Sequence, residues 1–430
     1  MTTLVDRAPT ARRAGRGRLV LEWAVLLLAA PFLLFPEVWP LAAAAALLAL
    51  AVVWLNALAV GRPLPPTPFN LVLVLWGIVL IIGMLASADP TETLPKATGL
   101  VLGLALWRFL VTAVTTRRHL SLATAGLLIV ALGFTVVGLL GLQELPKIPA
   151  LAALNPVQAA ALPVAIHPNQ LAGLICLYLP LLVSLIFSER GRFASLLWSV
   201  VFAALALLAG AILVLSQSRG GWLAAMAGLF TLLALWSAAL PPSRTRRALR
   251  VLTMLAAAAA LGAALWVGPA NLRDLWLNPP QETVVGTLTT LNFRKELWPW
   301  AVTAVGDFPF TGVGLGAFRQ VAFRLYPLPA AGGLDIGHAH NIFLQTALDT
   351  GLPGLVVYVA LLMVAAAAAW RAARRPRYRA LSLGLLAGLV ALHVFGLADA
   401  LALGSKPGLV FWYALGLLAV MNKEELVDET

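Results

Sequence analysis

Residues 120–142, LSLATAGLLIVALGFTVVGLLGL, form a continuous apolar stretch that begins shortly after Arg117 and Arg118. A helix needs about 20 apolar residues to cross the core of a bilayer, so this stretch predicts a membrane-spanning helix with a basic end. Similar stretches occur along the whole chain, at residues 19–35, 39–60, 69–86, 97–114, 169–187, 194–215, 221–240, 249–268, 352–370, 380–398 and 408–422. The sequence therefore predicts an all-α, polytopic integral membrane protein of about twelve transmembrane helices, with residues 1–430 forming a single membrane domain.

The composition also favours a membrane protein. Hydrophobic residues make up 61% of the chain and charged residues only 11%, whereas soluble domains carry about 25% charged residues. On a soluble protein the net charge of +12 would suggest nucleic acid as a partner. Here most arginines lie in short loops between apolar stretches, where basic residues determine topology. We therefore expect contacts with membrane lipids and none with nucleic acid.

Basic residues cluster in every second loop of the predicted topology. With the N-terminus inside, about twenty of the thirty Lys and Arg residues fall on the cytoplasmic side, as the positive-inside rule requires. They are Arg7, Arg12, Arg13, Arg16, Arg18, Arg62, Arg117, Arg118, Arg190, Arg192, Arg244, Arg246, Arg247, Arg250, Arg371, Arg374, Arg375, Arg377, Arg379 and Lys423. This pattern predicts a multi-pass protein of the inner (cytoplasmic) membrane with both termini in the cytoplasm.

Two long segments then face away from the cytoplasm, at residues 143–168 and 269–339. A connection as long as the second is uncommon unless it has its own structure or function. Residues 291–306 within it have the pattern of a short helix, and Trp298 and Trp300 suit the headgroup level of a membrane. We predict that residues 269–339 form an extracytoplasmic, periplasmic catalytic loop that contains short interfacial helices.

A histidine-containing segment follows this loop, HAHNIFLQTALDTGLPG at residues 338–354. Proline removes a backbone donor from a helix, so Gly351 and Pro353 predict a break after a short helix at 341–349. A membrane span follows the break. This arrangement would leave His340 at the mouth of the helical bundle rather than in lipid.

Four ordered motifs carry a resemblance to a known family. The first is His340-Asn341 followed after nine residues by Gly351 and after two more by Gly354. The others are HPNQLA at 167–172, SQSRGG at 216–221, and FRKELW at 293–298 continuing to DFPFTGVGLG at 307–316. In order and spacing they resemble the O-antigen ligase and O-antigen polymerase (WaaL/Wzy-type) superfamily of integral membrane glycosyltransferases.

The resemblance implies a GT-C-like glycosyltransferase of lipopolysaccharide biosynthesis. Such an enzyme moves a glycan en bloc from an undecaprenyl-pyrophosphate carrier to an envelope acceptor, here a sugar of the lipid A-core in an O-antigen ligase-like reaction. It implies no nucleotide sugar and no required metal, so we expect no cofactor. By motif position, the catalytic residues would be His340 and the pyrophosphate-binding Arg219 and Arg294.

The chemistry of these residue types fits that reaction. A pyrophosphate leaving group gains negative charge as its bond breaks, and the arginine fork matches phosphate oxygens and stays protonated. An acceptor hydroxyl needs a base, and histidine accepts protons near neutral pH. Attack from the face opposite the leaving group would invert the anomeric centre. Further substrate-binding candidates are His338, Asn341, Arg319, Arg324, His167 and Asn169.

Structural roles remain open for most of these residues. Arg219 and Arg294 could reach lipid phosphates from helix ends, and Arg319 and Arg324 could be solvated charges. Asn169 would cap the helix that it begins. His338 would point away from His340 if both lay on a helix.

Alternative functions also remain open. A zinc site would need a third ligand besides His338 and His340, from Asp335 or a distant loop, so we expect no metal site. A polysaccharide polymerase that joins lipid-linked repeat units is the main alternative to a ligase. A transporter is less favoured, because transporters place polar residues near the middle of the membrane. The predicted spans are nearly free of ionisable residues, with Glu22, Arg108 and His393 among the few exceptions.

Overall fold

The structure, a computed structural model, describes residues 8–59, 65–141, 167–188, 192–278, 289–326, 337–401 and 403–423. This part of the chain is all-helical, as predicted. Its helices are α1 (Ala8–Leu34), α2 (Pro40–Ala59), α3 (Asn70–Leu85), α4 (Pro90–Ala113), α5 (Arg117–Leu140), α6 (Pro168–Ile186), α7 (Arg192–Leu215), α8 (Arg219–Ala239), α9 (Arg244–Val267), α10 (Pro269–Leu277), α11 (Thr289–Asp307), α12 (Phe318–Leu325), α13 (Ile342–Ala373), α14 (Pro376–Phe395) and α15 (Gly408–Met421). Most of the predicted segment 143–168 lies outside the described residues, as do Arg62 and Asp335.

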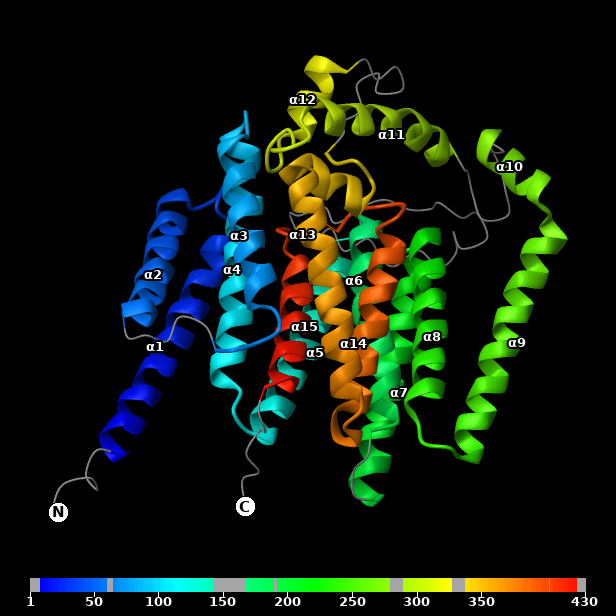
Figure 1. Cartoon of the computed structure of the whole chain (residues 1–430), viewed down its shortest axis with the longest axis horizontal. Coiled ribbons are helices and arrows are strands. Elements are labelled where there is room, and N and C mark those ends of the chain that lie inside the picture. The colour runs from blue at the N-terminus through cyan, green and yellow to red at the C-terminus, as the bar shows by residue number, and fades with distance from the viewer. Residues whose placement is uncertain are drawn as a thin grey trace.

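The predicted polytopic membrane protein is confirmed by the length and hydropathy of these helices. Among the described residues, nine helices are long and apolar enough to cross a membrane, and three shorter apolar segments occupy the remaining predicted spans at Leu19–Leu34, Asn70–Leu85 and Gly408–Met421. The long helices run roughly side by side, and the start of α1 and the end of α15 lie at the same end of the bundle (Figure 1). Helices α11 and α12 lie across the opposite end (Figure 1).

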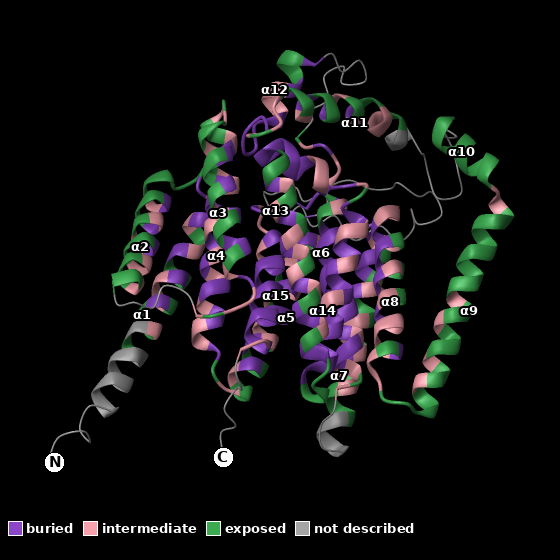
Figure 2. Ribbon diagram, viewed as in Figure 1, coloured by how far each residue is buried: buried purple, intermediate pink, exposed green. Residues whose placement is uncertain are grey.

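The core is centred on α6, α14 and α15, which are mostly buried, whereas no described side chain of α9 is buried (Figure 2). Small residues allow close helix packing in the centre. A Cβ added at Gly388 of α14 would overlap the carbonyl oxygen of Leu177 in α6. Packing through small residues is common between membrane helices, because lipid chains are as apolar as the side chains themselves.

The break predicted in the segment after His340 is present. Within α13, Gly351 has φ 72° and ψ 179°, which no helical residue adopts, and the N–H of Leu352 donates to the carbonyl oxygen of Pro309 at 2.7 Å. The short helix from Ile342 to Thr350 therefore meets the long span at a kink. Asn341 caps the short helix by accepting hydrogen bonds from the backbone N–H groups of Phe343 and Leu344.

The predicted loop 269–339 contains α10, α11 and α12, and α11 confirms the short helix expected at 291–306. The glycine-rich turn between α11 and α12 attaches this region to the bundle. Val313 donates its N–H to the carbonyl oxygen of Leu348 in α13 at 2.8 Å, and Leu315 donates to that of Gly83 in α3 at 2.8 Å. These bonds fix α11 and α12 over the end of the bundle where α13 begins.

Candidate functional site

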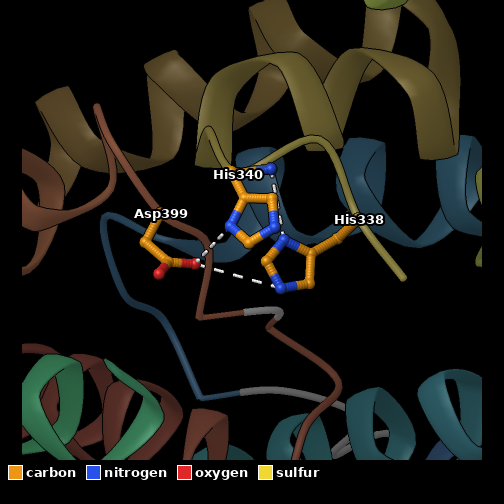
Figure 3. A group of neighbouring side chains, drawn as sticks. All are labelled: His338, His340 and Asp399. Atoms are coloured by element: carbon orange, nitrogen blue, oxygen red, sulfur yellow. Dashed lines mark hydrogen bonds and ion pairs between the residues drawn. The ribbon is translucent and has the colours of Figure 1, made fainter. Parts of the chain in front are cut away.

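Two histidines and a carboxylate converge at the end of the bundle that carries α11. His338 and His340 precede α13, and Asp399 lies in the loop between α14 and α15. The Nδ1 atom of His340 is 3.3 Å from Oδ1 of Asp399, and Nε2 of His338 is 3.9 Å from the same oxygen. Figure 3 shows the three side chains pointing toward one another. Both imidazoles therefore share one carboxylate oxygen.

The backbone between the two histidines is held on both sides. The N–H of Ala339 donates to Oε1 of Gln345 at 2.9 Å, and the indole N–H of Trp298 donates to the carbonyl oxygen of Ala339 at 3.0 Å. His340 itself has φ 49°, a left-handed conformation that is uncommon outside glycine. Such backbone persists only where its surroundings determine it. The hydrogen bonds of Ala339 provide that constraint and fix the direction of the His340 ring.

The two residues after His340 attach this segment to the loop of Asp399. Asn341 donates from Nδ2 to the carbonyl oxygen of Leu397 at 3.1 Å, and the N–H of Ile342 donates to that of Gly396 at 2.7 Å. The ring of Phe293 in α11 packs edge-on against the His340 ring at 5.7 Å between centroids. Three parts of the chain that are distant in sequence thus meet around one imidazole.

The expectation that His338 points away from His340 is wrong. It assumed a helix, but residues 338–341 precede α13 and are not helical. The two ring centroids are 4.2 Å apart, and Nδ1 of His338 accepts the backbone N–H of His340 at 3.2 Å. Burial, reinforced by the nearby charge of His340, lowers the pKa of His338 to about 4. His338 is therefore neutral at pH 7 and a weak base.

Asp399 is the residue that joins these groups. Burial by itself would raise its pKa, but contact with His340, the charge of both histidines and the backbone N–H of Ala400 together hold the pKa below its ordinary value. The N–H of Ala400 donates to Oδ1 at 2.8 Å, and Asn169 donates from Nδ2 to Oδ2 at 2.5 Å. The carboxylate is thus ionised and oriented by donors on both oxygens.

The interpretation of Asn169 as a helix cap is wrong. His167 occupies the cap of α6, because its Nδ1 accepts the N–H of Asn169 at 3.2 Å. The side chain of Asn169 instead connects Asp399 to α8, since its Oδ1 accepts the hydroxyl of Ser218 at 2.9 Å. Ser218 caps α8 and directly precedes Arg219. The HPNQLA and SQSRGG motifs therefore meet through one amide.

Arg294 of α11 lies against the same loop. Its Nε donates to the carbonyl oxygen of Ala398 at 2.7 Å. Burial lowers the pKa of Arg294, the negative charge of Asp399 raises it, and the positive charge of Arg219 lowers it. Arg294 therefore belongs to the surroundings of Asp399, and the charge of Arg219 at the start of α8 also acts on it.

Arg319 and Arg324 lie elsewhere on this end of the bundle, beside the first residues of α4. Arg319 forms an ion pair with Glu92 at 2.9 Å, and both side chains are about one-third exposed. The charge of Arg324 contributes to lowering the pKa of Asp89, after the larger effect of hydrogen bonding from Thr91. The ion pair of Arg319 thus joins α12 to α4.

The three converging groups also have the composition of a metal site. The candidate ligand atoms of His338, His340 and Asp399 all lie within 4.8 Å of one another. The third ligand that a zinc site would need is thus available from Asp399, in a loop distant in sequence. The hydrogen bond of His338 opposes this use, because Nδ1 accepts a backbone N–H and the neutral ring then carries its proton on Nε2. A proton on the nitrogen that faces Asp399 leaves no lone pair there for a metal.

Sequence reasoning missed Asp399. The signal was present in the sequence, because an acidic residue lies between two apolar stretches with few other charges nearby. An ionisable group in such a position is a functional candidate in a membrane protein. Gln345 and Trp298 were also missed as groups that hold the histidine segment, because their hydrogen bonds depend on the fold.

The fold and these contacts define a polytopic all-helical membrane protein with a histidine–carboxylate cluster at one end. Residues 203–359 match the family model Wzy_C, described as O-antigen ligase. The match confirms the resemblance to the O-antigen ligase and polymerase superfamily, whose members are glycosyltransferase-like enzymes. It contains Arg219, Arg294 and His340, and it ends before Asp399. No curated protein matches the chain.

Proposed function

We propose that this protein is an O-antigen ligase-like glycosyltransferase of the inner membrane. It would transfer a glycan en bloc from undecaprenyl pyrophosphate to an envelope acceptor, such as a sugar of the lipid A-core. The observation that carries the proposal is the convergence of His340, Asp399 and Arg294 at the end of the bundle that carries α11. We place this end on the extracytoplasmic side, because the arginine-rich loops lie at the other end.

In this proposal His340 is the general base. Asp399 would hold a proton on Nδ1, so that Nε2 carries the lone pair. The acceptor hydroxyl gives its proton to Nε2 while its oxygen attacks the anomeric carbon. The bond from that carbon to the pyrophosphate oxygen breaks, and its electron pair leaves with the pyrophosphate. His338 is a poor candidate for this role, because its pKa of about 4 makes proton capture unfavourable at neutral pH.

Arg219 and Arg294 would stabilise the departing pyrophosphate. Fixed positive charge aimed at developing negative charge is often the largest catalytic contribution, and each charged hydrogen bond is worth roughly 1.5–3 kcal/mol. Asn341, Asn169, His167 and His338 surround the reacting position and would orient the glycan. Arg319 and Arg324 would act at a greater distance, on acidic groups of the substrate. The reaction requires no metal in this scheme.

The first experiment uses purified protein with a lipid-linked glycan and a lipid A-core acceptor. We expect His340→Ala and Arg219→Ala to abolish transfer, while Arg118→Ala, on an exposed residue at the other end, retains it. Full turnover by the first two variants would refute the mechanism.

A second experiment separates the ligase from the alternatives. Deletion of the gene would leave lipid-linked polymer unattached if the protein is a ligase. Accumulation of carriers with single repeat units would instead indicate a polymerase. Unchanged envelope glycan together with altered solute uptake would indicate a transporter.

A further inference from the structure

A large cavity lies at the end of the bundle opposite α11 and α12. It has a volume of about 1290 Å³ and is bounded by α5, α6, α7, α8, α9 and α14. The walls come from the first turns of α5, α9 and α14 and the last turns of α6 and α8, which lie at the lower end in Figure 1. Leucine, phenylalanine and tryptophan side chains form most of the lining, including Trp198 and Trp236. A space of this kind suits hydrocarbon chains.

The charged residues of the lining all have the same sign. Among the described residues that form the wall, Arg117, Arg377 and Arg379 are cationic and none is acidic. Arg377 lies over the ring of Tyr378, 5.0 Å from its centroid. Arg379 is buried and donates from Nε to the carbonyl oxygen of Ala373. Positive charge beside an apolar cavity is complementary to a molecule that joins an anion to hydrocarbon chains.

Two hydroxyl groups of the lining are buried without a hydrogen-bond partner among the described residues. They are the phenol of Tyr378, a residue only 3% exposed, and the hydroxyl of Ser188 at the end of α6. A buried polar group without a partner is destabilising, so native structures rarely contain one. Both hydroxyls belong to the wall that also carries Arg377. A ligand with phosphate or ester oxygens would satisfy them.

We propose that this cavity binds an anionic diacyl phospholipid. The acyl chains lie against the apolar walls between α5, α7 and α8, and the phosphate faces Arg117, Arg377 and the hydroxyl of Tyr378. Basic pockets between helices on the cytoplasmic side recognise anionic headgroups in this way. The site is separate from the histidine cluster, which lies at the other end of the bundle. The proposal therefore does not depend on the proposed transferase activity.

The test measures lipid retention by the full-length protein. The protein is placed in nanodiscs of phosphatidylcholine that contain 20% phosphatidylglycerol. It is then extracted gently, and its bound lipids are counted by native mass spectrometry. We expect at least one phosphatidylglycerol to be retained in preference to phosphatidylcholine. Equal retention of the two lipids, or preferential retention of a polyprenyl phosphate added as competitor, would overturn the proposal.

Matched variants locate the site. Each basic residue contributes about 1 kcal/mol to anionic lipid binding, which corresponds to an affinity loss of about five-fold for Arg377→Gln. Arg374→Gln is the control, because Arg374 is also exposed at the same loop but does not line the cavity. Equal losses in the two variants would assign the effect to general surface charge and contradict the site.

Tyr378→Phe gives an independent test that a folding defect cannot imitate. The phenol has no hydrogen-bond partner among the described residues, so its removal leaves the delipidated protein at least as thermally stable as the native protein. The same change weakens retention of phosphatidylglycerol and reduces the stabilisation that added phosphatidylglycerol gives. Unaltered lipid retention by Tyr378→Phe would show that the hydroxyl does not face the ligand.

Discussion

Replacing Asp399 with asparagine removes the negative charge beside both histidines and nearly preserves the size of the side chain. In the native site Oδ1 faces Nδ1 of His340 at 3.3 Å and accepts the N–H of Ala400 at 2.8 Å. An asparagine can keep one acceptor oxygen, but its amide group would then present hydrogens or a neutral oxygen to His340. The change therefore tests the charge of residue 399 and the tautomer of His340, while the position of the imidazole stays the same.

The expected loss follows from two effects. A hydrogen bond between charged groups is worth roughly 1.5–3 kcal/mol, so its loss as His340 becomes protonated slows the reaction about 10- to 150-fold. An amide N–H facing Nδ1 also favours the tautomer with its proton on Nε2, which cannot accept a proton from the acceptor. In a serine-protease triad, the corresponding Asp to Asn change reduces kcat about 10⁴-fold. We expect Asp399→Asn to reduce kcat between about 10²- and 10⁴-fold.

The assay is single-turnover transfer of a lipid-linked glycan by purified protein. Asp307→Asn is the matched control, because Asp307 accepts a hydrogen bond from Tyr326 at the same end of the bundle and has no described contact with either histidine. Thermal unfolding in detergent checks that both variants fold. If folded Asp399→Asn retains kcat within about three-fold of the native value, the assignment of His340 as a base oriented by Asp399 is refuted.

Three further predictions concern the stability and precision of the fold. The pKa of His338 is lowered from 6.5 to about 4, so the unfolded chain binds more protons than the folded chain between these pH values. The free energy of unfolding should therefore fall as pH decreases from 6.5 toward 4, with a slope of at most about 1.4 kcal/mol per pH unit. Thermal unfolding measured against pH should show a flatter dependence for His338→Gln. Glu22→Gln removes the carboxylate that pairs with buried Arg108 between α1 and α4. It should lower the free energy of unfolding by about 3–5 kcal/mol, measured by chemical denaturation. A variant as stable as the native protein would show that the ion pair is dispensable. Gly388→Ala places a methyl group against the carbonyl of Leu177 and should lower the unfolding temperature far more than Gly262→Ala, whose added Cβ meets nothing within 4 Å.

The sequence predicts the fold well because membrane helices are specified by local properties. Apolar length and the position of arginines are visible without knowledge of any contact, and the break at Gly351 follows from the properties of Gly351 and Pro353. The partners within the site are different, because they depend on how helices pack. Asp399 meets the two histidines only because the loop after α14 lies beside the start of α13. No spacing rule connects positions so far apart along the chain.

Errors at individual residues have the same origin. Asn169 occupies a position that favours a helix cap, yet His167 takes that role and leaves the amide to join Asp399 with Ser218. The prediction for His338 assumed helical geometry, which the positive φ of His340 excludes. In both cases a local preference gives way to a contact with another element. Such positions, where local rules fail, are expected at functional sites.

The proposed mechanism gives an anionic residue and two arginines complementary roles in one reaction. In that mechanism the acceptor gives its proton to His340, so positive charge would appear beside Asp399, which already carries the opposite charge. At the same time negative charge grows on the departing pyrophosphate, beside Arg219 and Arg294 in the proposed mechanism. Each new charge thus forms next to a fixed charge of opposite sign, so little reorganisation is needed during the step. Arg294 is under the influence of both partners, because the charge of Asp399 raises its pKa and the charge of Arg219 lowers it.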